Sequence, residues 1–357
     1  MIAHHQKKIL FLVKGDSFGG AERIALDIAL ALKSNFKSVY FLSANFYLAE
    51  TCGSNDITHF IVPSRFFKTP WGYTLLFIKL LSICLTKKID TIQYFHRIFQ
   101  PIITILQLIL RVRTVYSAVN IFNDIKGFIV RANCYTALSK KIYTNLNDFY
   151  RINPDKIKLI YHGIHRLGLK VNIKSLKAGE PLTLGYAGRF VEEKGIHILL
   201  QSLNNLEFSN YKLIIKGIGE VEDYIRSYIS SNTLSQNVII EPWGPVLENF
   251  WQKIDVLVLP SIYEEGLGLI VLEGMAHGKL VIASKIGAID EMVINDYNGF
   301  LIEPNSIESL AGRINYIYQN GVSDTILINA LQTASKFDLN NSIKEYYEFY
   351  KNSKIIK

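Results

Sequence analysis

The stretch from Pro260 to Gly278 reads P-S-I-Y-E-E-G-L-G-L-I-V-L-E-G-M-A-H-G. It follows Asp255–Leu259, a short apolar run rich in β-branched residues, which is typical of a fully buried parallel strand. After Pro260 and Ser261 the apolar spacing becomes helical, with Leu269, Leu272 and Ala276 on one side. The sequence therefore predicts a strand, an acidic glycine-containing loop and a helix, the unit from which open α/β sheets are built.

Ligands of such sheets bind at the carboxyl ends of strands, where loops lead into helix N-termini. A helix N-terminus favours an anion, ordinarily a phosphate. Here the loop carries Glu264 and Glu265, and Glu273 follows in the first turns of the helix. Carboxylates repel a bare phosphate, so their expected partners are sugar hydroxyls.

A second charged loop follows another predicted strand, Leu182–Ala187. The sequence Y-A-G-R-F-V-E-E-K-G runs from Tyr186 to Gly195 and places Arg189 and Lys194 five residues apart. A guanidinium fork and a compact ammonium together neutralise the charge that develops on a departing diphosphate. Both loops are predicted at the carboxyl ends of strands in the same domain.

These two patterns resemble the Glu-x7-Glu and Gly-Arg-x4-Lys-Gly motifs of the retaining glycosyltransferases of family 4, which have the GT-B fold. The resemblance implies two Rossmann-like, doubly wound α/β domains that face a central cleft. It implies that Glu265 contacts the donor sugar, that the segment Gly266–Leu267–Gly268–Leu269 holds the sugar hydroxyls, and that Glu273 binds the ribose. It also places Gly188, Arg189 and Lys194 at the diphosphate, with Glu265, Arg189 and Lys194 as catalytic groups.

Weaker similarities extend the resemblance to most of the chain. Gly19 and Gly20, in a loop before a helix, resemble the family's first loop beside the diphosphate, because glycines let backbone amides approach a ligand. Gly217 in Gly-Ile-Gly resembles a turn near the nucleotide. The family often has a histidine after a first-domain strand, but Val119 stands at that place, and we expect Asn120 or His96 to take its role.

The alternation of strands and helices predicts two domains. We expect an N-terminal acceptor-binding domain at residues 1–165 and a C-terminal donor-binding domain at 166–339, with 166–180 as the linker. By the resemblance, a last helix within 340–357 packs back on the first domain. Asn298-Gly299, between Tyr297 and Phe300, indicates a tight turn, commonly of type I′.

Composition limits the other possibilities. The 357 residues are 49% hydrophobic and 20% charged, so the chain is globular, and no apolar run reaches the length of a spanning helix. The three cysteines lack metal-ligand spacing, which favours a reduced cytoplasmic setting. Neither an Asp-x-Asp pair nor a zinc-binding motif is present. We therefore expect a metal-independent enzyme without a cofactor, whose nucleotide-sugar is a substrate.

Charge is unevenly distributed. Residues 1–165 carry 21 Lys and Arg against 9 Asp and Glu, a net charge of +12, whereas residues 166–357 carry 18 against 22, a net charge of −4. A basic half with long apolar helices suits an anionic surface. Because no nucleic-acid motif is present, we expect peripheral association with the inner face of the cell membrane and no nucleic-acid partner.

The sequence thus predicts a retaining hexosyl- or other glycosyltransferase. It is expected to move a sugar from a UDP-linked donor to a glycan or a lipid-linked glycan. The expected setting is the synthesis of a bacterial surface polysaccharide, such as lipopolysaccharide, O-antigen or capsule. Three alternatives remain open: a sugar-nucleotide epimerase of the same fold, a non-catalytic partner subunit of a transferase pair, and an oxidoreductase. The last is disfavoured, because neither half carries G-x-G-x-x-G after its first strand.

Overall fold

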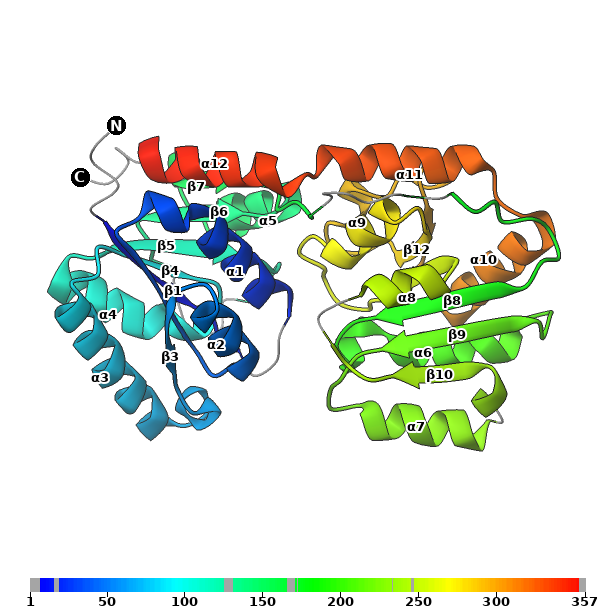
Figure 1. The fold of residues 1–357 in the computed structure, drawn as a ribbon, viewed down its shortest axis with the longest axis horizontal. Coiled ribbons are helices and arrows are strands. Elements are labelled where there is room, and N and C mark those ends of the chain that lie inside the picture. The colour runs from blue at the N-terminus through cyan, green and yellow to red at the C-terminus, as the bar shows by residue number, and fades with distance from the viewer. Residues whose placement is uncertain are drawn as a thin grey trace. The chain divides into compact units, whose positions relative to one another are not determined.

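The computed structural model describes residues 7–15, 19–124, 131–165, 171, 173–232, 234–244 and 247–352. The chain divides into two compact units (Figure 1). Unit 1 comprises Met1–His162 and Asn340–Lys357, and unit 2 comprises Gly163–Leu339. The division falls at His162/Gly163, three residues before the expected boundary.

Unit 1 is built around a parallel sheet of seven strands in the order β3-β2-β1-β4-β5-β6-β7. The strands are β1 (Lys8–Leu12), β2 (Ser38–Ser43), β3 (Thr58–Ile61), β4 (Thr91–Tyr94), β5 (Arg113–Ala118), β6 (Cys134–Ala137) and β7 (Ile157–Leu159). The helices are α1 (Gly20–Leu32), α2 (Phe46–Gly53), α3 (Pro70–Lys87), α4 (Gln100–Leu110), α5 (Lys140–Thr144) and α12 (Leu339–Asn352). The strand order reverses between β1 and β4, which pair directly, Leu10 with Ile92.

Unit 2 repeats this plan with six parallel strands in the order β10-β9-β8-β11-β12-β13. The strands are β8 (Leu182–Ala187), β9 (Tyr211–Lys216), β10 (Val238–Glu241), β11 (Val256–Leu259), β12 (Leu280–Ser284) and β13 (Phe300–Ile302). The helices are α6 (Ile196–Ser202), α7 (Glu222–Ser231), α8 (Glu248–Lys253), α9 (Leu269–Ala276), α10 (Ile307–Asn320) and α11 (Asp324–Lys336).

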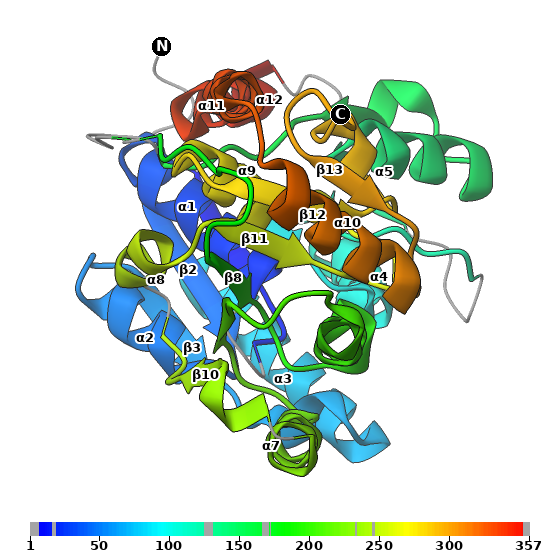
Figure 2. The same ribbon diagram turned by 90° about the vertical axis from the view of Figure 1, so that its right-hand side faces the viewer.

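Helices cover both faces of the unit 2 sheet (Figure 2), with α6 next to α7 and α10, and α9 next to α11. The central strands are mostly apolar because both of their faces are buried; all four residues of β11 are in the core. The strand order reverses between β8 and β11, where Val256 pairs with Leu184. Each unit is therefore a doubly wound α/β domain with one topological switch point.

The last helix belongs to unit 1. Within α12, the side chains of Tyr346 and Tyr350 are buried, and the Ser342 hydroxyl donates to the carbonyl of Tyr161 at 2.7 Å. The Tyr350 hydroxyl donates to the side-chain oxygen of Gln93 in β4. Unit 1 is thus completed by a segment that follows unit 2 in the sequence.

The described part of the expected linker packs on unit 2. Residues 166–170 and 172 lie outside the described residues, but Leu176 is buried and its carbonyl accepts the amide of Val322 at 2.7 Å. The amide of Gly179 donates to the carbonyl of Tyr318 at 2.7 Å. Residues 173–180 therefore form part of the unit 2 fold.

A tight turn is present at residues 296–298, where the amides of Tyr297 and Asn298 donate to the carbonyl of Ile294, but the expected type I′ at Asn298-Gly299 is wrong. Such a turn needs positive φ at both residues, and here only the nearby Asp296, at 60°, has it. The following strand, β13, pairs in parallel with β12, so no hairpin forms. The buried side chain of Asn298 instead accepts the amide of Ile294 at 2.7 Å and donates to the carbonyl of Met292 at 2.9 Å.

Two further properties follow from burial and helix length. The three cysteines are buried and form no disulfide, and burial raises the pKa of Cys52 and of Cys84 to about 12. Within the described part of the chain, none of the helices combines the length and the apolar character needed to cross a bilayer.

Candidate active site

The two charged loops of unit 2 meet at its switch point. The loop with Arg189 and Lys194 follows β8, and the loop with Glu265 follows β11, the neighbouring strand. Both leave the carboxyl edge of the sheet, where doubly wound folds bind ligands. Lys194 and Glu265, which are 71 positions apart in the sequence, therefore lie in direct contact.

A buried ion pair joins the loops. The Lys194 ammonium donates to Oε1 of Glu265 at 2.6 Å, and the Ser261 hydroxyl donates to the same oxygen. The Glu265 side chain is 11% exposed and the Lys194 side chain 24% exposed. Both partners are therefore largely buried, the lysine less completely than the carboxylate.

Glu265 is held in its ionised form. Burial raises the pKa of its carboxyl, but the charge and hydrogen bond of Lys194, the hydrogen bond of Ser261 and the charge of Arg189 outweigh burial. The pKa consequently lies below its ordinary value of 4.5. A carboxylate that is ionised at neutral pH suits hydroxyl donors such as those of a sugar ring.

Close backbone contacts fix the relative position of the two loops. The amide of Ile262 donates to the carbonyl of Glu193 at 3.0 Å. Gly195 has a φ of 66°, and a Cβ there would lie 1.9 Å from the carbonyl oxygen of Pro260. Only glycine permits this approach, so the Lys194 loop is locked onto the end of β11.

A third loop supports Glu265 from the other side. Gly287, after β12, has a φ of 57°, and a Cβ there would lie 2.1 Å from the carbonyl oxygen of Glu265. That carbonyl accepts the amide of Ala288 at 2.8 Å. The backbone of Glu265 is therefore clamped between two neighbouring loops.

Arg189 is the exposed member of the group. Its carbonyl accepts the Tyr186 hydroxyl at 2.9 Å, and the amide of the next residue, Phe190, donates to the carbonyl of Ile218 at 2.9 Å. A Cβ at Gly217 would lie 2.0 Å from the carbonyl oxygen of Gly188. A glycine is therefore needed at position 217 because the Arg189 loop packs directly against its backbone.

The remaining unit 2 candidates surround the start of α9. Gly266 and Leu267 are buried, Gly268 is the N-cap, and Leu269 begins the helix. The N-cap has no side chain to bond the first amides of the helix. Glu273, one turn further, is 7% exposed. Glu265 and Glu273 are therefore both buried carboxylates at the carboxyl edge of one sheet.

In unit 1 the candidates gather around Glu22, which the sequence reasoning missed. Its buried carboxylate accepts the amides of Gly15 at 3.2 Å and Gly19 at 3.1 Å, and lies 3.8 Å from Nε2 of His96. His96 follows β4, so this cluster occupies the switch point of the first sheet. The position of Glu22, third in the helix after a glycine N-cap, was the available signal.

The position where the family has a histidine is part of the packing in unit 1. Val119 is buried directly after β5, and Asn120 is exposed. A Cβ at Gly20 would meet no atom within 4 Å, so open space lies beside the start of α1. Asn120 and Gly20 are exposed and His96 is half-buried, so these three remain candidates, whereas the buried Val119 does not.

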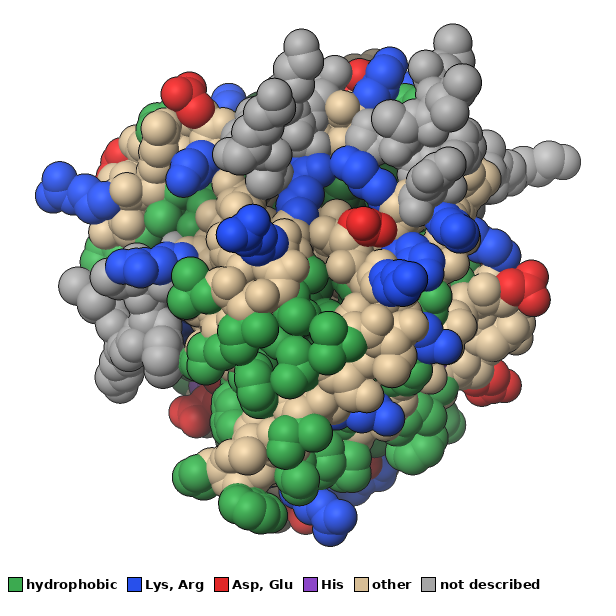
Figure 3. All heavy atoms as spheres, turned by 90° about the vertical axis from the view of Figure 1, so that its left-hand side faces the viewer, with side chains coloured by type: hydrophobic (Ala, Val, Ile, Leu, Met, Phe, Trp, Pro, Cys, Tyr) green, Lys and Arg blue, Asp and Glu red, His purple; other side chains and the backbone are tan. Residues whose placement is uncertain are grey.

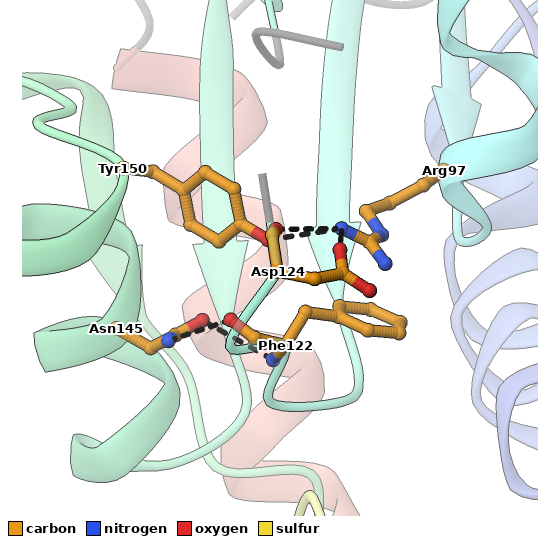
Figure 4. A network of polar contacts seen from close by, with 5 residues as sticks. All are labelled: Arg97, Phe122, Asp124, Asn145 and Tyr150. Carbon is orange, nitrogen blue, oxygen red and sulfur yellow. Dashed lines mark hydrogen bonds and ion pairs between the residues drawn. The ribbon is translucent and has the colours of Figure 1, made fainter. Parts of the chain in front are cut away.

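A polar network fixes the segment after β5 (Figure 4). The Arg97 guanidinium donates to the Asp124 carboxylate at 2.9 Å and to the Tyr150 hydroxyl at 3.0 Å, and stacks 3.6 Å from the centre of the Phe122 ring. The Asn145 side chain donates to the carbonyl of Phe122 at 3.0 Å. Arg97 therefore stabilises the segment after β5, whereas its neighbour His96 lies near the carboxylate of Glu22.

No group of three or more His, Cys, Asp or Glu residues is arranged to hold a metal ion in the ranges that the structure describes. The charged groups found at the unit 2 edge are instead two cations and two buried carboxylates, a set suited to an anion and to hydroxyl groups.

Two family models match consecutive parts of the chain. The model for Glycosyltransferase Family 4 matches residues 18–166, and the model for Glycosyl transferases group 1 matches residues 170–334. The second match contains the Arg189, Lys194, Glu265 and Glu273 motifs. The two matches fall on the first and the second βα-built half.

Several curated proteins are similar to this chain over part of their length. An uncharacterized glycosyltransferase of Methanocaldococcus jannaschii is 27% identical over 230 residues, 60% of this chain and 58% of that protein. The lipopolysaccharide 1,2-N-acetylglucosaminetransferase of Salmonella typhimurium is 31% identical over 188 residues, 49% of each chain. This chain spans about half the length of the curated relatives it matches.

Among solved structures, Anabaena HepE in complex with UDP and glucose superposes with a TM-score of 0.81. It covers 97% of this chain and 100% of its own, at 21% sequence identity. The likeness confirms the predicted fold, GT-B with two Rossmann-like α/β domains.

Proposed function

This chain belongs to the family 4 (group 1) glycosyltransferases, and from that premise we propose that it transfers a sugar from a nucleoside diphosphate-sugar to an acceptor hydroxyl with retained anomeric configuration. The observation that carries the proposal is the Lys194–Glu265 pair at the unit 2 switch point, with Arg189 close enough to lower the pKa of Glu265. It combines cations for a diphosphate with a carboxylate for sugar hydroxyls.

In the proposed reaction the bond between the anomeric carbon and the diphosphate oxygen breaks, and the acceptor oxygen takes its place. Lys194 and Arg189 neutralise the negative charge on the departing diphosphate, and the acceptor proton passes to a phosphate oxygen on the same face of the sugar. Glu265 orients the sugar and Glu273 holds the ribose. Since the carboxylate of Glu265 already binds Lys194 and Ser261, we favour orientation over a covalent role for it.

We further propose that no metal ion or cofactor takes part, because the two cations and the start of α9 supply the positive charge that a divalent ion would otherwise provide. Activity should then be unchanged by a chelator such as EDTA. Loss of activity on chelation, restored by Mg²⁺ or Mn²⁺, would contradict this part of the proposal.

The proposed donor is UDP-linked and the proposed acceptor is a lipid-linked glycan of bacterial surface polysaccharide synthesis. HepE was solved with UDP and glucose, and the name of the Salmonella relative places it in lipopolysaccharide synthesis. The basic first half of this chain, with a net charge of +12 over residues 1–165, suits an acceptor that carries phosphate at a membrane surface.

A screen of UDP- and GDP-sugars for binding and slow donor hydrolysis tests the proposal. We expect one UDP-sugar to bind and to be hydrolysed, and the first-formed sugar anomer, followed by NMR, to match that of the donor. Release of nucleotide together with a new sugar epimer would favour the epimerase alternative. Binding of no nucleotide-sugar would favour a non-catalytic subunit.

A further inference from the structure

The outer faces of α3 and α4 expose a group of large apolar side chains. On α3, Trp71, Ile78 and Leu85 follow one another at intervals of seven residues, two helical turns each, and so form one stripe. On α4, Ile105, Leu108 and Ile109 share a face at spacings of three and four. Trp71 is 73% and Leu108 77% exposed, so neither is part of the core.

These two helices are neighbours, and their stripes form one surface. α3 contacts α4 in unit 1. Figure 3 shows hydrophobic side chains gathered on this side of the molecule, with Lys and Arg side chains and some Asp and Glu side chains around them. Single exposed apolar residues are ordinary, but a contiguous group of this size marks an interaction site.

The stretch of chain that contains α3 and α4 is almost entirely positive in its charged residues. Between Pro63 and Val112 the chain has seven Lys and Arg residues and one acidic residue, Asp90. The Asp90 carboxylate accepts the backbone amide of Lys8 at 2.7 Å. An acidic counterpart to the exposed cations is therefore missing from this stretch of sequence.

Exposed cations lie along the apolar stripes: Arg65 and Lys68 precede α3, Lys79 lies within it, and three more stand at the C-terminal ends of the two helices. Lys87 and Lys88 end α3, and Arg111 ends α4; all three are exposed. Both helices connect parallel strands, so their C-terminal ends lie at the same edge of the sheet. An apolar face bordered by cations matches the acyl boundary and the phosphates of an anionic bilayer.

We propose that the α3–α4 surface, defined by Trp71, Ile78, Leu85, Ile105, Leu108 and Ile109 with Lys87, Lys88 and Arg111, docks on an anionic lipid bilayer. The apolar side chains enter the headgroup boundary, Trp71 takes the interfacial position that tryptophan favours, and the three cations bind lipid phosphates. This deepens the proposed function, which requires access to a lipid-linked acceptor, but docking itself needs neither donor nor acceptor.

The experiment measures co-sedimentation of the full chain with vesicles of phosphatidylglycerol and phosphatidylcholine, and with phosphatidylcholine alone. We expect binding to the anionic vesicles that weakens with added salt. The variant K87Q/K88Q/R111Q should bind them about 100-fold more weakly, since each cation near such a surface contributes about fivefold. The matched control K177Q/K212Q/K336Q, on unit 2, should bind like the unaltered chain.

A second pair of variants tests the apolar contribution. I78S/L108S/I109S should lose at least about tenfold in binding, whereas I239S/I294S/I328S, which alters three comparably exposed isoleucines of unit 2, should not. All six side chains are exposed, so both variants should fold. Trp71 emission should shift to the blue with anionic vesicles, and the shift should be lost in Trp71→Phe.

Three results would overturn the proposal. They are no binding of the unaltered chain to anionic vesicles, equal binding by the surface and control variants, and a dimer in analytical ultracentrifugation that only the surface variants dissociate. The last would assign the surface to a second copy of the chain. Hydrolysis of a soluble nucleotide-sugar by the same variants separates failure of docking from failure of the proposed activity.

Discussion

Lys194 and Lys174 are a natural matched pair at the residue scale. Lys194 binds Glu265 at the carboxyl edge of β8 and β11, and Lys174 binds Asp255 at 2.7 Å at the amino edge of the same two strands. The ion pairs have the same chemistry but lie at opposite ends of the strands. Only the first lies where doubly wound sheets bind ligands.

Replacement of Lys194 tests its proposed role. Lys194→Ala should lower kcat/KM for sugar transfer about 10²–10³-fold, because one preorganised cation at a developing charge contributes about 3–4 kcal/mol to transition-state stabilisation. Steady-state kinetics with the donor found in the screen is the measurement. Lys174→Ala should keep nearly full activity, and equal losses in both variants would remove Lys194 from the mechanism.

Acid sensitivity is predicted for His59 in β3. Burial lowers the pKa of His59 from 6.5 to about 4, and its Nε2 contacts the Ser43 hydroxyl at 2.9 Å. The unfolded chain takes up the proton first, so the stabilisation is present above pH 6.5 and is lost as the pH falls toward 4. The free energy of unfolding should decrease by about 3 kcal/mol over this range.

The variant His59→Gln isolates this contribution. Its free energy of unfolding, measured by denaturant titration at each pH, should lack that part of the pH dependence. If the two proteins lose stability in parallel between pH 6.5 and 4, His59 is not the group responsible.

At the residue scale, spacing after a strand was enough to predict which side chains lie at one edge of the sheet; their roles stay predictions. Arg189, Lys194 and Glu265 could be placed because each follows a recognisable apolar strand, and parallel strands share a carboxyl edge. Ser261 could not be found, since its hydrogen bond to Glu265 depends on the path of the backbone beyond Pro260. The spacing alone could not distinguish a supporting glycine such as Gly217 from a ligand-binding one.

At the element scale, the loop after β12 determines where the loop after β11 can lie. Gly287→Ala should destabilise the protein by about 2–5 kcal/mol, because the new Cβ would collide with the backbone of Glu265 at a left-handed position. Gly179→Ala is the control, since Gly179 has a similar φ of 73° but no atom within 4 Å of a Cβ. It should cost about 1 kcal/mol.

Thermal unfolding of both variants, with activity measured below the transition, separates two costs of the added Cβ. Both variants carry the cost of a left-handed backbone, and only Gly287→Ala also carries the collision with Glu265. Equal destabilisation would mean that the contact with Glu265 relaxes without cost. A folded Gly287→Ala protein with full activity would show that the position of Glu265 is not set by this loop.

The expectation of a type I′ turn at Asn298-Gly299 failed because of how the neighbouring strands pair. The dipeptide favours a type I′ turn between antiparallel strands, but β12 and β13 are parallel and cannot be joined by a hairpin. The Asn298 amide is used instead inside the fold, where it also donates to Thr333 in α11 at 2.9 Å. Local turn preference was overridden by the topology of the sheet.

For the whole molecule, the βα alternation was sufficient to predict two doubly wound domains. Strand-like runs of the sequence overlap twelve of the thirteen strands found in the described residues, and only the short β13 was not anticipated as a strand. The association of α12 with unit 1 could be expected only from the family resemblance. Periodicity defines the buried face of a helix but not the sheet on which that face packs.

One side chain tests the attachment of α12. Tyr350→Phe removes the donor to Gln93, whose amide also donates to Ser117 at 2.7 Å inside unit 1. Leaving a buried acceptor without that donor should cost about 1–3 kcal/mol. Hydrogen exchange should accelerate in β4 and β5 but not in the strands of unit 2; uniform acceleration in both units would contradict this assignment.

The position of α12 in the sequence has a consequence for synthesis. A ribosome releases β1 to β7 first, but the buried tyrosines Tyr346 and Tyr350 emerge only after all of unit 2. The growing polypeptide must therefore hold an incomplete N-terminal core while a second domain of similar design folds beside it. Residues 163–339 must be translated before that core can be completed, so its unfinished apolar surface is open to aggregation for as long as their translation lasts.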